Sequence, residues 1–347
     1  MPDIVCHEVP TSVGGLFRPR FAFAAAAEEL LRRLDLDVVH DMGHGWYGNV
    51  FMPHGGTRAG SFRQNVQSSP SWLRRCKELT WSVLPRYSMV RELENRQYVS
   101  DGSRLFIALS QMVWRDMGRF HSLPPNLVRI VYNGIDTVRF SPTHRTLCRA
   151  AVRRSLGIRN EVLFLLVAHN FKLKGVGPAI EAAARVARTL PELRLVVIGR
   201  DRPDRYERPA QRLGCPDVVR FVGGVADSVP YYAAADVYVH PTYYDPCSLV
   251  VLEALASALP VITTVHNGAG ELLTPGVQGF VLADPTDVGS LVGYMSQLMD
   301  GAVRSECSRR ARELAEQHDL ERNYREILAV YEEAARVSPL VKWKAAA

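Results

Sequence analysis

An acidic side chain interrupts a strongly apolar stretch in YYDPCSLVVLEALASALPVITT, residues 243–264. Glu253 lies between the apolar runs 249–252 and 254–256, which on their own predict a buried helix. An isolated carboxylate in such surroundings costs on the order of several kcal/mol unless it is hydrogen-bonded. Glu253 is therefore either a structural residue paired with a backbone amide or an arginine, or a residue that receives hydrogen bonds from a ligand.

The start of the same segment has the features of an anion-binding helix terminus. Asp245 is a good N-cap residue, and Pro246 is well suited to the first helical position. The amides of Cys247, Ser248 and Leu249 would then have no partner within the helix and could face a phosphate or the hydroxyls of a sugar. Asp245 could equally be a helix cap and nothing more, and the two roles can coexist.

Other short motifs exclude several classes of protein. The chain contains no GxGxxG and no GxxxxGK[ST], which argues against a dehydrogenase and against a P-loop enzyme. The six cysteines include no CxxC pair, so they are interpreted as reduced thiols and not as a zinc site or a disulfide framework. Asp35-Leu36-Asp37 matches the metal-binding DxD of some sugar transferases, but its place between a predicted helix and a predicted strand favours a turn. We expect no metal and no cofactor.

The elements that must position these residues alternate between strand and helix patterns through most of the chain. The apolar run 162–168 is typical of a central parallel strand, and the alternation predicts an α/β fold with doubly wound parallel sheets. Ligands of such sheets bind beyond the carboxyl ends of the strands. Local patterns also predict a strand at residues 4–6 and a helix-like segment at residues 72–96. A length of 347 residues suits two domains.

Five segments resemble, in the same order and with similar spacing, those of the cytosolic retaining glycosyltransferases of family 4. They are VYNGIDTVRFSP (131–142), HNFKLKG (169–175), VRFVGGV (219–225), ADVYVHPTYYDPCSLVVLEALASALPVITT (235–264) and NGAGELL (267–273). Within this family the chain is most similar to bacterial enzymes of lipopolysaccharide-core or surface-polysaccharide assembly.

The resemblance implies the GT-B fold, in which two Rossmann-like domains face a cleft. The acceptor-side domain is expected at residues 1–145 and the nucleotide-sugar-binding domain at residues 146–318. A helix at 319–337 is expected to cross back to the first domain. The chain resembles a family member that lacks its first N-terminal βα unit, and Gly14-Gly15 is interpreted as an ordinary loop.

The resemblance also assigns roles to residues. Lys174 corresponds to the family lysine that holds the donor diphosphate, and Asp245 to the first glutamate of the signature, which contacts the donor sugar. His54 corresponds to the histidine of a His-Gly pair that, in the family, approaches the donor sugar at the cleft. The alternative is a histidine whose hydrogen bonds are all made within its own loop. Glu253 corresponds to the second signature glutamate, to which a ribose 2′,3′-diol offers two donors. The residues expected to bind the nucleotide-sugar are Glu253, Lys172, Asn170, Phe221, Val222, Gly223, Cys247, Ser248 and Leu249.

Three residues depart from the family pattern. Leu173 stands where the family has the arginine of an Arg-Lys pair, and Lys172, one place away, is the candidate substitute. Ala258 stands where the family has glycine after the helix, and a left-handed alanine there costs about 1 kcal/mol. Asp245 is one methylene shorter than glutamate, which could alter sugar selectivity.

Basic residues are concentrated in the first part of the chain. Residues 1–150 contain 19 lysines and arginines against 13 acidic residues, whereas the remainder contains 23 of each. Residues 58–119 contain 11 basic and 5 acidic residues. This region suits an anionic membrane surface or a phosphorylated acceptor, and it equally suits a solvated arginine-rich surface. Nucleic acid is not an expected partner, since no binding motif for it is recognisable.

The sequence gives no indication of a signal peptide, and no apolar run reaches the roughly 18 residues needed to span a bilayer. We expect a cytoplasmic protein that is associated with the inner face of the membrane if the basic region binds lipid. The expected activity is transfer, with retention, of a hexose from a nucleotide-diphosphate sugar, preferably a UDP-sugar, to a glycan or glycolipid acceptor. The alternatives are a nucleotide-sugar epimerase of the same fold and a catalytically inactive sugar-nucleotide-binding protein.

Overall fold

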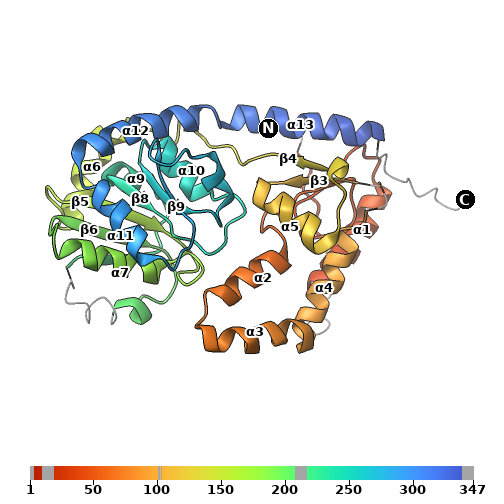
Figure 1. Cartoon of the computed structure of the whole chain (residues 1–347). Coiled ribbons are helices and arrows are strands. Elements are labelled where there is room, and N and C mark those ends of the chain that lie inside the picture. Colours follow the sequence, from red (N-terminus) through yellow and green to blue (C-terminus); the bar gives the residue numbers. More distant parts are fainter. Residues whose placement is uncertain (1–3, 10–18, 101, 103, 208–216, 338–347) are drawn as a thin grey trace, which may run out of the picture. The chain divides into compact units, whose positions relative to one another are not determined.

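The computed structural model describes residues 4–9, 19–100, 102, 104–207 and 217–337 (Figure 1). The chain forms two compact units: unit 1 is Met1–Val131 with Arg325–Ala347, and unit 2 is Tyr132–Tyr324. The helix α13 (Leu320–Val337) begins in unit 2 and continues into unit 1. The boundary proposed from the sequence at residues 145 and 146 lies inside unit 2. Gly14-Gly15 lies outside the described residues.

Unit 1 is built on a four-stranded parallel sheet in the order β1-β2-β3-β4. The strands are β1 (His40–Asp41), β2 (Val50–Phe51), β3 (Leu105–Ala108) and β4 (Val128–Ile130). The helices are α1 (Pro19–Arg33), α2 (Arg58–Gln67), α3 (Ser71–Val83), α4 (Pro85–Gln97) and α5 (Gln111–His121), with a short 3-10 helix at Pro125–Leu127. Phe51, Phe106, Val113 and Met117 are buried in the core between the sheet and α5.

Two local predictions in unit 1 are wrong. Residues 72–96 form two helices, α3 and α4, because Pro85 disfavours a helical conformation at the preceding residue, and Leu84 is extended with ψ 131°. Residues 4–9 form no strand, since this short apolar run has no neighbouring strand to which its backbone is paired within the described sheet. A local pattern alone does not supply the hydrogen-bonding partner that a strand requires.

Unit 2 contains a six-stranded parallel sheet in the order β10-β9-β8-β5-β6-β7, with helices on both faces (Figure 1). The strands are β5 (Val162–Val167), β6 (Leu193–Ile198), β7 (Val219–Gly223), β8 (Val237–Val239), β9 (Val261–Thr264) and β10 (Gly279–Leu282). The helices are α6 (His144–Ser155), α7 (Val176–Ala187), α9 (Val229–Ala234), α10 (Leu249–Ala256), α11 (Val288–Gln297) and α12 (Gly301–Glu316), with a 3-10 helix at Gly268–Leu272. The two parallel α/β sheets predicted from the sequence are confirmed.

The core of unit 2 explains why the sheet forms. Phe164, Leu166, Leu195 and Val197 are fully buried on β5 and β6, which pair in register over six residues. Because all strands are parallel, their carboxyl ends meet at one edge, and the loops that follow them converge there. This edge carries the segments after β5, β7 and β8 that the sequence singled out.

Ala258 has a left-handed backbone, with φ +57°, as expected from its position directly after α10. Replacing it with glycine is expected to stabilise unit 2 by about 1 kcal/mol, because glycine has no Cβ to strain this conformation. The change should raise the midpoint of thermal unfolding by about 2 °C. As a control, Ala150→Gly in the exposed interior of α6 should lower the midpoint instead. A lower midpoint for A258G would contradict the strain assigned to Ala258.

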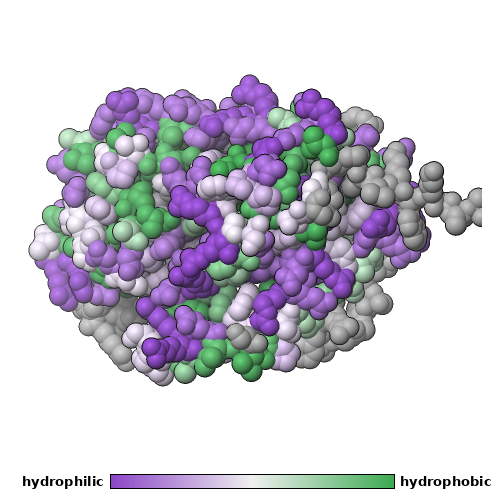
Figure 2. Space-filling view, turned by 45° about the vertical axis from the view of Figure 1, so that its right-hand side comes forward, coloured by the Kyte–Doolittle hydropathy of each residue, from purple (hydrophilic) through white to green (hydrophobic). Residues whose placement is uncertain are grey.

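No helix in the described part of the chain is both long and apolar enough to cross a membrane. Hydrophilic residues are spread over the face shown in Figure 2, among smaller hydrophobic patches.

Candidate functional site

Lys174 and Asp245 meet at the carboxyl edge of the unit 2 sheet, although 70 residues separate them in the chain. The Lys174 ammonium lies 2.6 Å from Asp245 Oδ2 and also donates to the Tyr244 carbonyl at 3.2 Å. Lys174 is directed here by Gly175, whose φ is +73° and whose Cα faces the Pro241 carbonyl so closely that a Cβ would lie 2.0 Å from that oxygen. The turn after β5 therefore requires glycine next to the lysine.

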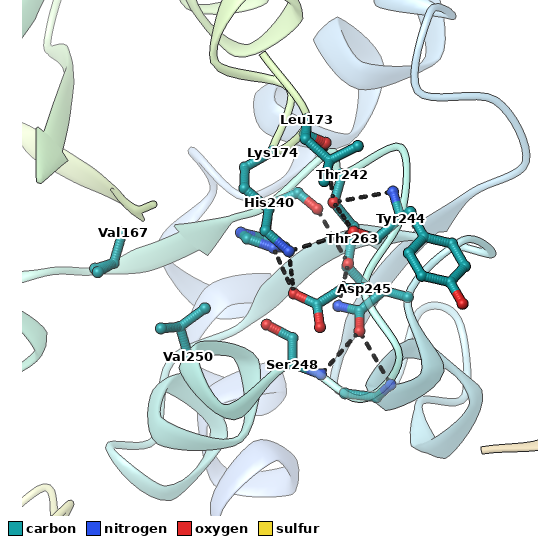
Figure 3. Close-up of polar contacts among 12 residues, drawn as sticks. Val167, Leu173, Lys174, His240, Thr242, Tyr244, Asp245, Ser248, Val250 and Thr263 are labelled. Carbon is teal, nitrogen blue, oxygen red and sulfur yellow. Dashed lines mark hydrogen bonds and ion pairs between the residues drawn. The ribbon is translucent and has the colours of Figure 1, made fainter. Parts of the chain in front are cut away.

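A buried histidine lies next to the Asp245 oxygen that Lys174 also contacts, as Figure 3 shows. Nε2 of His240, a fully buried residue at the end of β8, lies 3.5 Å from Asp245 Oδ2. Burial opposes ionisation of Asp245, but His240 and the charge of Lys174 outweigh it and lower its pKa to about 2. Burial lowers the pKa of His240, so the imidazole is neutral and the ammonium at 2.6 Å is the principal countercharge.

The expectation that Asp245 caps α10 is wrong. The helix begins at Leu249 with Ser248 as its N-cap residue, so Pro246 is not at the first helical position. Residues 245–248 do not join the helix because Asp245 pairs in a strand-like bridge with Asn267, and its amide donates to the His266 carbonyl at 2.9 Å. The Asp245 carboxylate is engaged by Lys174 instead of by the helix amides.

The three residues expected to offer amides differ in their surroundings. The Ser248 amide donates to Asn267 Oδ1 at 3.2 Å, so it is already bonded. The Cys247 carbonyl accepts from Asn133 Nδ2 at 2.7 Å, and burial raises the pKa of its thiol to about 12, which excludes a reactive thiolate. Leu249 is half exposed and starts the helix, so its amide and the next two lack intrahelical partners. The N-terminus of α10 thus lies three residues further along the chain than expected, with Ser248 in place of Asp245 as the N-cap residue.

Ser248 adds a second polar group at this terminus. The residue is 2% exposed, and its Oγ has no hydrogen-bonding partner among the described residues. A buried hydroxyl without a partner is costly unless a ligand or water meets it. Ser248 therefore supports the expectation of a polar ligand next to α10.

Glu253 lies one turn into α10 and is partly buried. Burial raises its pKa, whereas a hydrogen bond with the Tyr232 hydroxyl and the charge of Arg139 lower it. No salt bridge involves Glu253 among the described residues. The carboxylate is thus neither fully solvated nor neutralised by an arginine, and it retains the capacity to accept hydrogen bonds from a ligand.

The expected base-binding residues are the last three of β7, at the same edge of the sheet. Phe221 and Val222 are half-buried, and Gly223 is exposed with φ +83°. The Phe221 ring packs against that of Phe171, with centroids 6.0 Å apart. Phe171 is buried beneath Phe221, so the half-buried Phe221 ring is the apolar surface beside the exposed Gly223, which suits a planar base.

Asn170 and Lys172 are exposed in the turn that follows β5. Asn170 Oδ1 accepts from the Leu173 amide at 3.0 Å, so this side chain shapes the turn that carries Lys174. Lys172 is a second cationic residue in the same turn, two positions before Lys174.

His54 belongs to unit 1 and follows β2. It lines a pocket of about 770 Å³ together with Glu94 and the aromatic residues Phe62, Trp81 and Tyr87. The three rings lie with centroids 4.6 to 5.1 Å apart. Burial and, to a smaller extent, His44 lower the pKa of His54. Its imidazole is therefore neutral at pH 7 and can accept or donate a hydrogen bond.

Glu94 at the edge of this pocket predicts a pH effect on stability. It is 3% exposed, and burial raises its pKa to about 7 against the opposing Arg58 amide bond. Because the pKa of Glu94 is higher in the folded protein, folding favours the protonated carboxyl. The stability that protonated Glu94 contributes is therefore lost as pH rises from about 4.5 to 7. Glu94→Gln should remove this loss, and its stability relative to the unsubstituted protein should rise by about 2 kcal/mol between pH 5 and pH 8.

Denaturant unfolding at the two pH values measures this difference. Glu92→Gln on the same helix is the control, because the Glu92 side chain is 58% exposed. An equal change in both variants would contradict a special role for burial at Glu94.

No group of three or more histidine, cysteine, aspartate or glutamate side chains capable of holding a metal occurs within the described ranges.

Two family models match successive parts of the chain. The family described as Glycosyltransferase Family 4 matches residues 3–139, and the family described as Glycosyl transferases group 1 matches residues 149–317. The chain belongs to the family 4 glycosyltransferases. Both halves of the chain are therefore recognised, in the order in which the two sheets occur.

The curated proteins that are similar to this chain are also named as glycosyltransferases. Lipopolysaccharide glucosyltransferase WaaG of Escherichia coli (strain K12) is 28% identical over 247 residues, covering 70% of this chain and 66% of that protein. D-inositol 3-phosphate glycosyltransferase of Kribbella flavida is 33% identical over 208 residues, covering 55% of this chain and 47% of that protein. The chain thus spans between about half and two thirds of the length of these curated relatives.

A solved structure shows the same fold. The crystal structure of WaaG, a glycosyltransferase involved in lipopolysaccharide biosynthesis, matches with a TM-score of 0.74 and 26% identity. The match covers 95% of this chain and 85% of that chain. The GT-B fold expected from the sequence is confirmed.

Three residues of the candidate site were not predicted. His240 supports Asp245, Asn267 fixes the chain before α10, and Tyr232 contacts Glu253. His240 at a strand end, five residues before Asp245, is a signal that could have been used. Asn267 and Tyr232 depend on contacts between distant segments, which no spacing along the chain reveals.

Proposed function

We propose that the protein is a retaining glycosyltransferase that moves a hexose from a nucleotide-diphosphate sugar to a glycan or glycolipid of the cell surface. UDP-glucose is the first donor to test, because the relative WaaG is named a lipopolysaccharide glucosyltransferase. The proposal extends the family assignment to a donor, an acceptor class and a stereochemical course.

The observation that best supports this proposal is that Lys174, Asp245 and the start of α10 lie together at one edge of the sheet. In the proposal, the donor diphosphate lies against Lys174 and the first amides of α10, where a cation and a helix terminus both favour negative charge. Glu253, one turn further along the same helix, receives the ribose hydroxyls. The base rests on Phe221 and the Gly223 turn.

This arrangement addresses the difficult step of the reaction. Cleavage of the bond between sugar and phosphate leaves negative charge on the departing diphosphate while positive charge develops on the sugar. Lys174 stabilises the first of these charges, so a metal is not required by the proposal. Asp245, ionised and buried, orients Lys174 and faces the donor sugar. The acceptor hydroxyl attacks from the side of the leaving phosphate, which takes its proton.

A screen of nucleotide-sugars by thermal shift, followed by product analysis, tests the proposal. UDP-glucose should raise the unfolding midpoint, and a sugar or glycolipid acceptor should yield a glycoside whose anomeric proton in NMR has the donor's configuration. An inverted product would overturn the retaining course. Interconversion of the sugar without a glycoside would indicate an epimerase, and binding without any turnover an inactive binding protein.

For the acceptor side, we propose the unit 1 pocket beside His54 and the basic residues 58–119. The aromatic cluster of Phe62, Trp81 and Tyr87 supplies an apolar wall for a sugar ring. The excess of basic charge favours contact with an anionic membrane on the cytoplasmic side, where a glycolipid acceptor is found. The fraction of protein that sediments with anionic vesicles should fall as the salt concentration increases. A bound fraction that does not change with salt would contradict the electrostatic contact.

A further inference from the structure

Unit 2 contains a second cationic site, apart from Lys174 and Asp245. A pocket of about 630 Å³ is lined by six arginines and only two carboxylates. We call it the arginine pocket. Its arginines are Arg145, Arg149, Arg153, Arg154, Arg159 and Arg304, and its carboxylates are those of Glu161 and Asp236.

The arginine pocket lies at the opposite edge of the sheet from the donor site. Glu161 directly precedes β5 and Asp236 directly precedes β8, so both mark the amino ends of parallel strands. Lys174 and Asp245 follow the carboxyl ends of the same two strands. An anion bound in the arginine pocket is therefore not the donor diphosphate in the proposed position.

Two of the six arginines have structural partners. Arg149 and Arg153 bond the two oxygens of Asp236 at 2.6 and 3.1 Å, and both also donate to the Ala234 carbonyl at the end of α9. These contacts neutralise Asp236 and satisfy the last turn of a short helix. Glu161 has its own partner outside the pocket, Arg194, at 3.3 Å.

The other four arginines have no carboxylate partner among the described residues. Arg145 is fixed by the Ala235 carbonyl at 3.1 Å, and its Nε is buried without a hydrogen-bonding partner. Arg304 is fixed by the carbonyls of Leu298 and Met299 at 2.7 and 3.0 Å. Arg154 and Arg159 are exposed at the rim. Backbone carbonyls thus hold two guanidinium groups in place without cancelling their charge.

Like charges gathered around a hollow repel one another unless an anion enters. Burial and the charge of Arg149 lower the pKa of Arg145; the Asp236 carboxylate opposes them, and Arg304 lowers this pKa further. Guanidinium groups match the oxygens of a phosphate in a two-point geometry, and their hydration is weak enough to be given up on binding.

We propose that the arginine pocket binds a phosphomonoester or diphosphate group, carried by a soluble metabolite or by a lipid headgroup. The site is separate from the donor site and gives unit 2 a second ligand, whose binding stabilises the folded unit by mass action. Four guanidinium groups without carboxylate partners, two of them anchored to backbone carbonyls, provide the recognition.

Calorimetric titration of the full chain with pyrophosphate at constant ionic strength tests the soluble ligand. The double variant Arg154→Gln with Arg159→Gln removes two rim charges that bond no described residue through their side chains, so folding is preserved. Its affinity for pyrophosphate should fall at least tenfold. Arg188→Gln, an exposed arginine after α7, is the matched control and should change the affinity less than twofold.

Lys174→Ala separates the two sites. If pyrophosphate binding disappears in K174A and is unchanged in the rim variant, pyrophosphate binds only the donor site and the proposal is overturned. Equal weakening in the rim variant and in R188Q would indicate a general charge effect and would also overturn it.

Vesicles containing phosphatidic acid test the lipid source. Binding to these vesicles that is lost in the rim variant, without pyrophosphate binding, would support the site with a lipid as its ligand. Absence of both kinds of binding in the unsubstituted protein would refute the arginine pocket as a phosphate site.

Discussion

Lys174→Ala is expected to lower kcat/KM for transfer from UDP-glucose by about 100- to 1000-fold, the usual effect of removing one group that stabilises developing negative charge. The ammonium lies 2.6 Å from Asp245 and close to the start of α10, where the proposal places the diphosphate. The affinity for UDP should fall much more than the affinity for uridine, since uridine has no phosphate. Steady-state kinetics and calorimetry measure both effects.

The same substitution also removes the partner of a buried carboxylate. The side chains of Lys174 and Asp245 are 20% and 14% exposed, so K174A should cost about 2 kcal/mol of folding stability. Adding Asp245→Asn removes the unpaired charge and should restore much of the stability but none of the activity. Recovery of activity in the double variant would show that K174A acts through folding alone. Equal losses of UDP and uridine affinity would contradict the phosphate contact.

Glu253→Ala is expected to weaken UDP binding about tenfold or more, since the carboxylate would accept charge-assisted hydrogen bonds from both ribose hydroxyls. Uridine should lose affinity to a similar extent, in contrast to its behaviour with K174A, because it carries the same ribose. Calorimetric titration with the two ligands separates the ribose contact from the phosphate contact.

A ligand lacking one hydroxyl makes the Glu253 test specific. 2′-Deoxy-UDP should bind the unsubstituted protein more weakly than UDP does, whereas E253A should bind the two ligands almost equally. Burial raises the pKa of Glu253, so ionisation of this carboxyl opposes folding at neutral pH, and its removal in E253A offsets part of the stability lost with the Tyr232 hydrogen bond. An unchanged preference for UDP in folded E253A would exclude the ribose role.

Local patterns predicted the parallel strands of unit 2 well. The apolar run at 162–168 forms β5 (Val162–Val167), because a strand buried on both faces needs apolar residues at every position. Ala258, which stands where the family has glycine, has a left-handed backbone, so the condition under which alanine is costly there is met. Glu253 is partly buried in α10, as its apolar neighbours indicated.

Helix boundaries were predicted less well, for two different reasons. Pro85 divides residues 72–96 into α3 and α4, and this signal was present in the sequence but was given too little weight. The start of α10 at Leu249 was misplaced because Asp245 and Ser248 both have the preferences of an N-cap residue. The Asp245 carboxylate binds Lys174 instead, a partner from another loop.

The sequence by itself determined the α/β class, the two parallel sheets and the family, because the periodicity of apolar residues and the spacing of motifs are properties of the chain alone. The tertiary structure decided which polar groups meet: Lys174 with Asp245, Asn267 with Ser248, and four arginines without carboxylates around one pocket. Each polar side chain has several candidate partners along the chain. Only the folded arrangement of the loops at the two edges of the sheet selects among them.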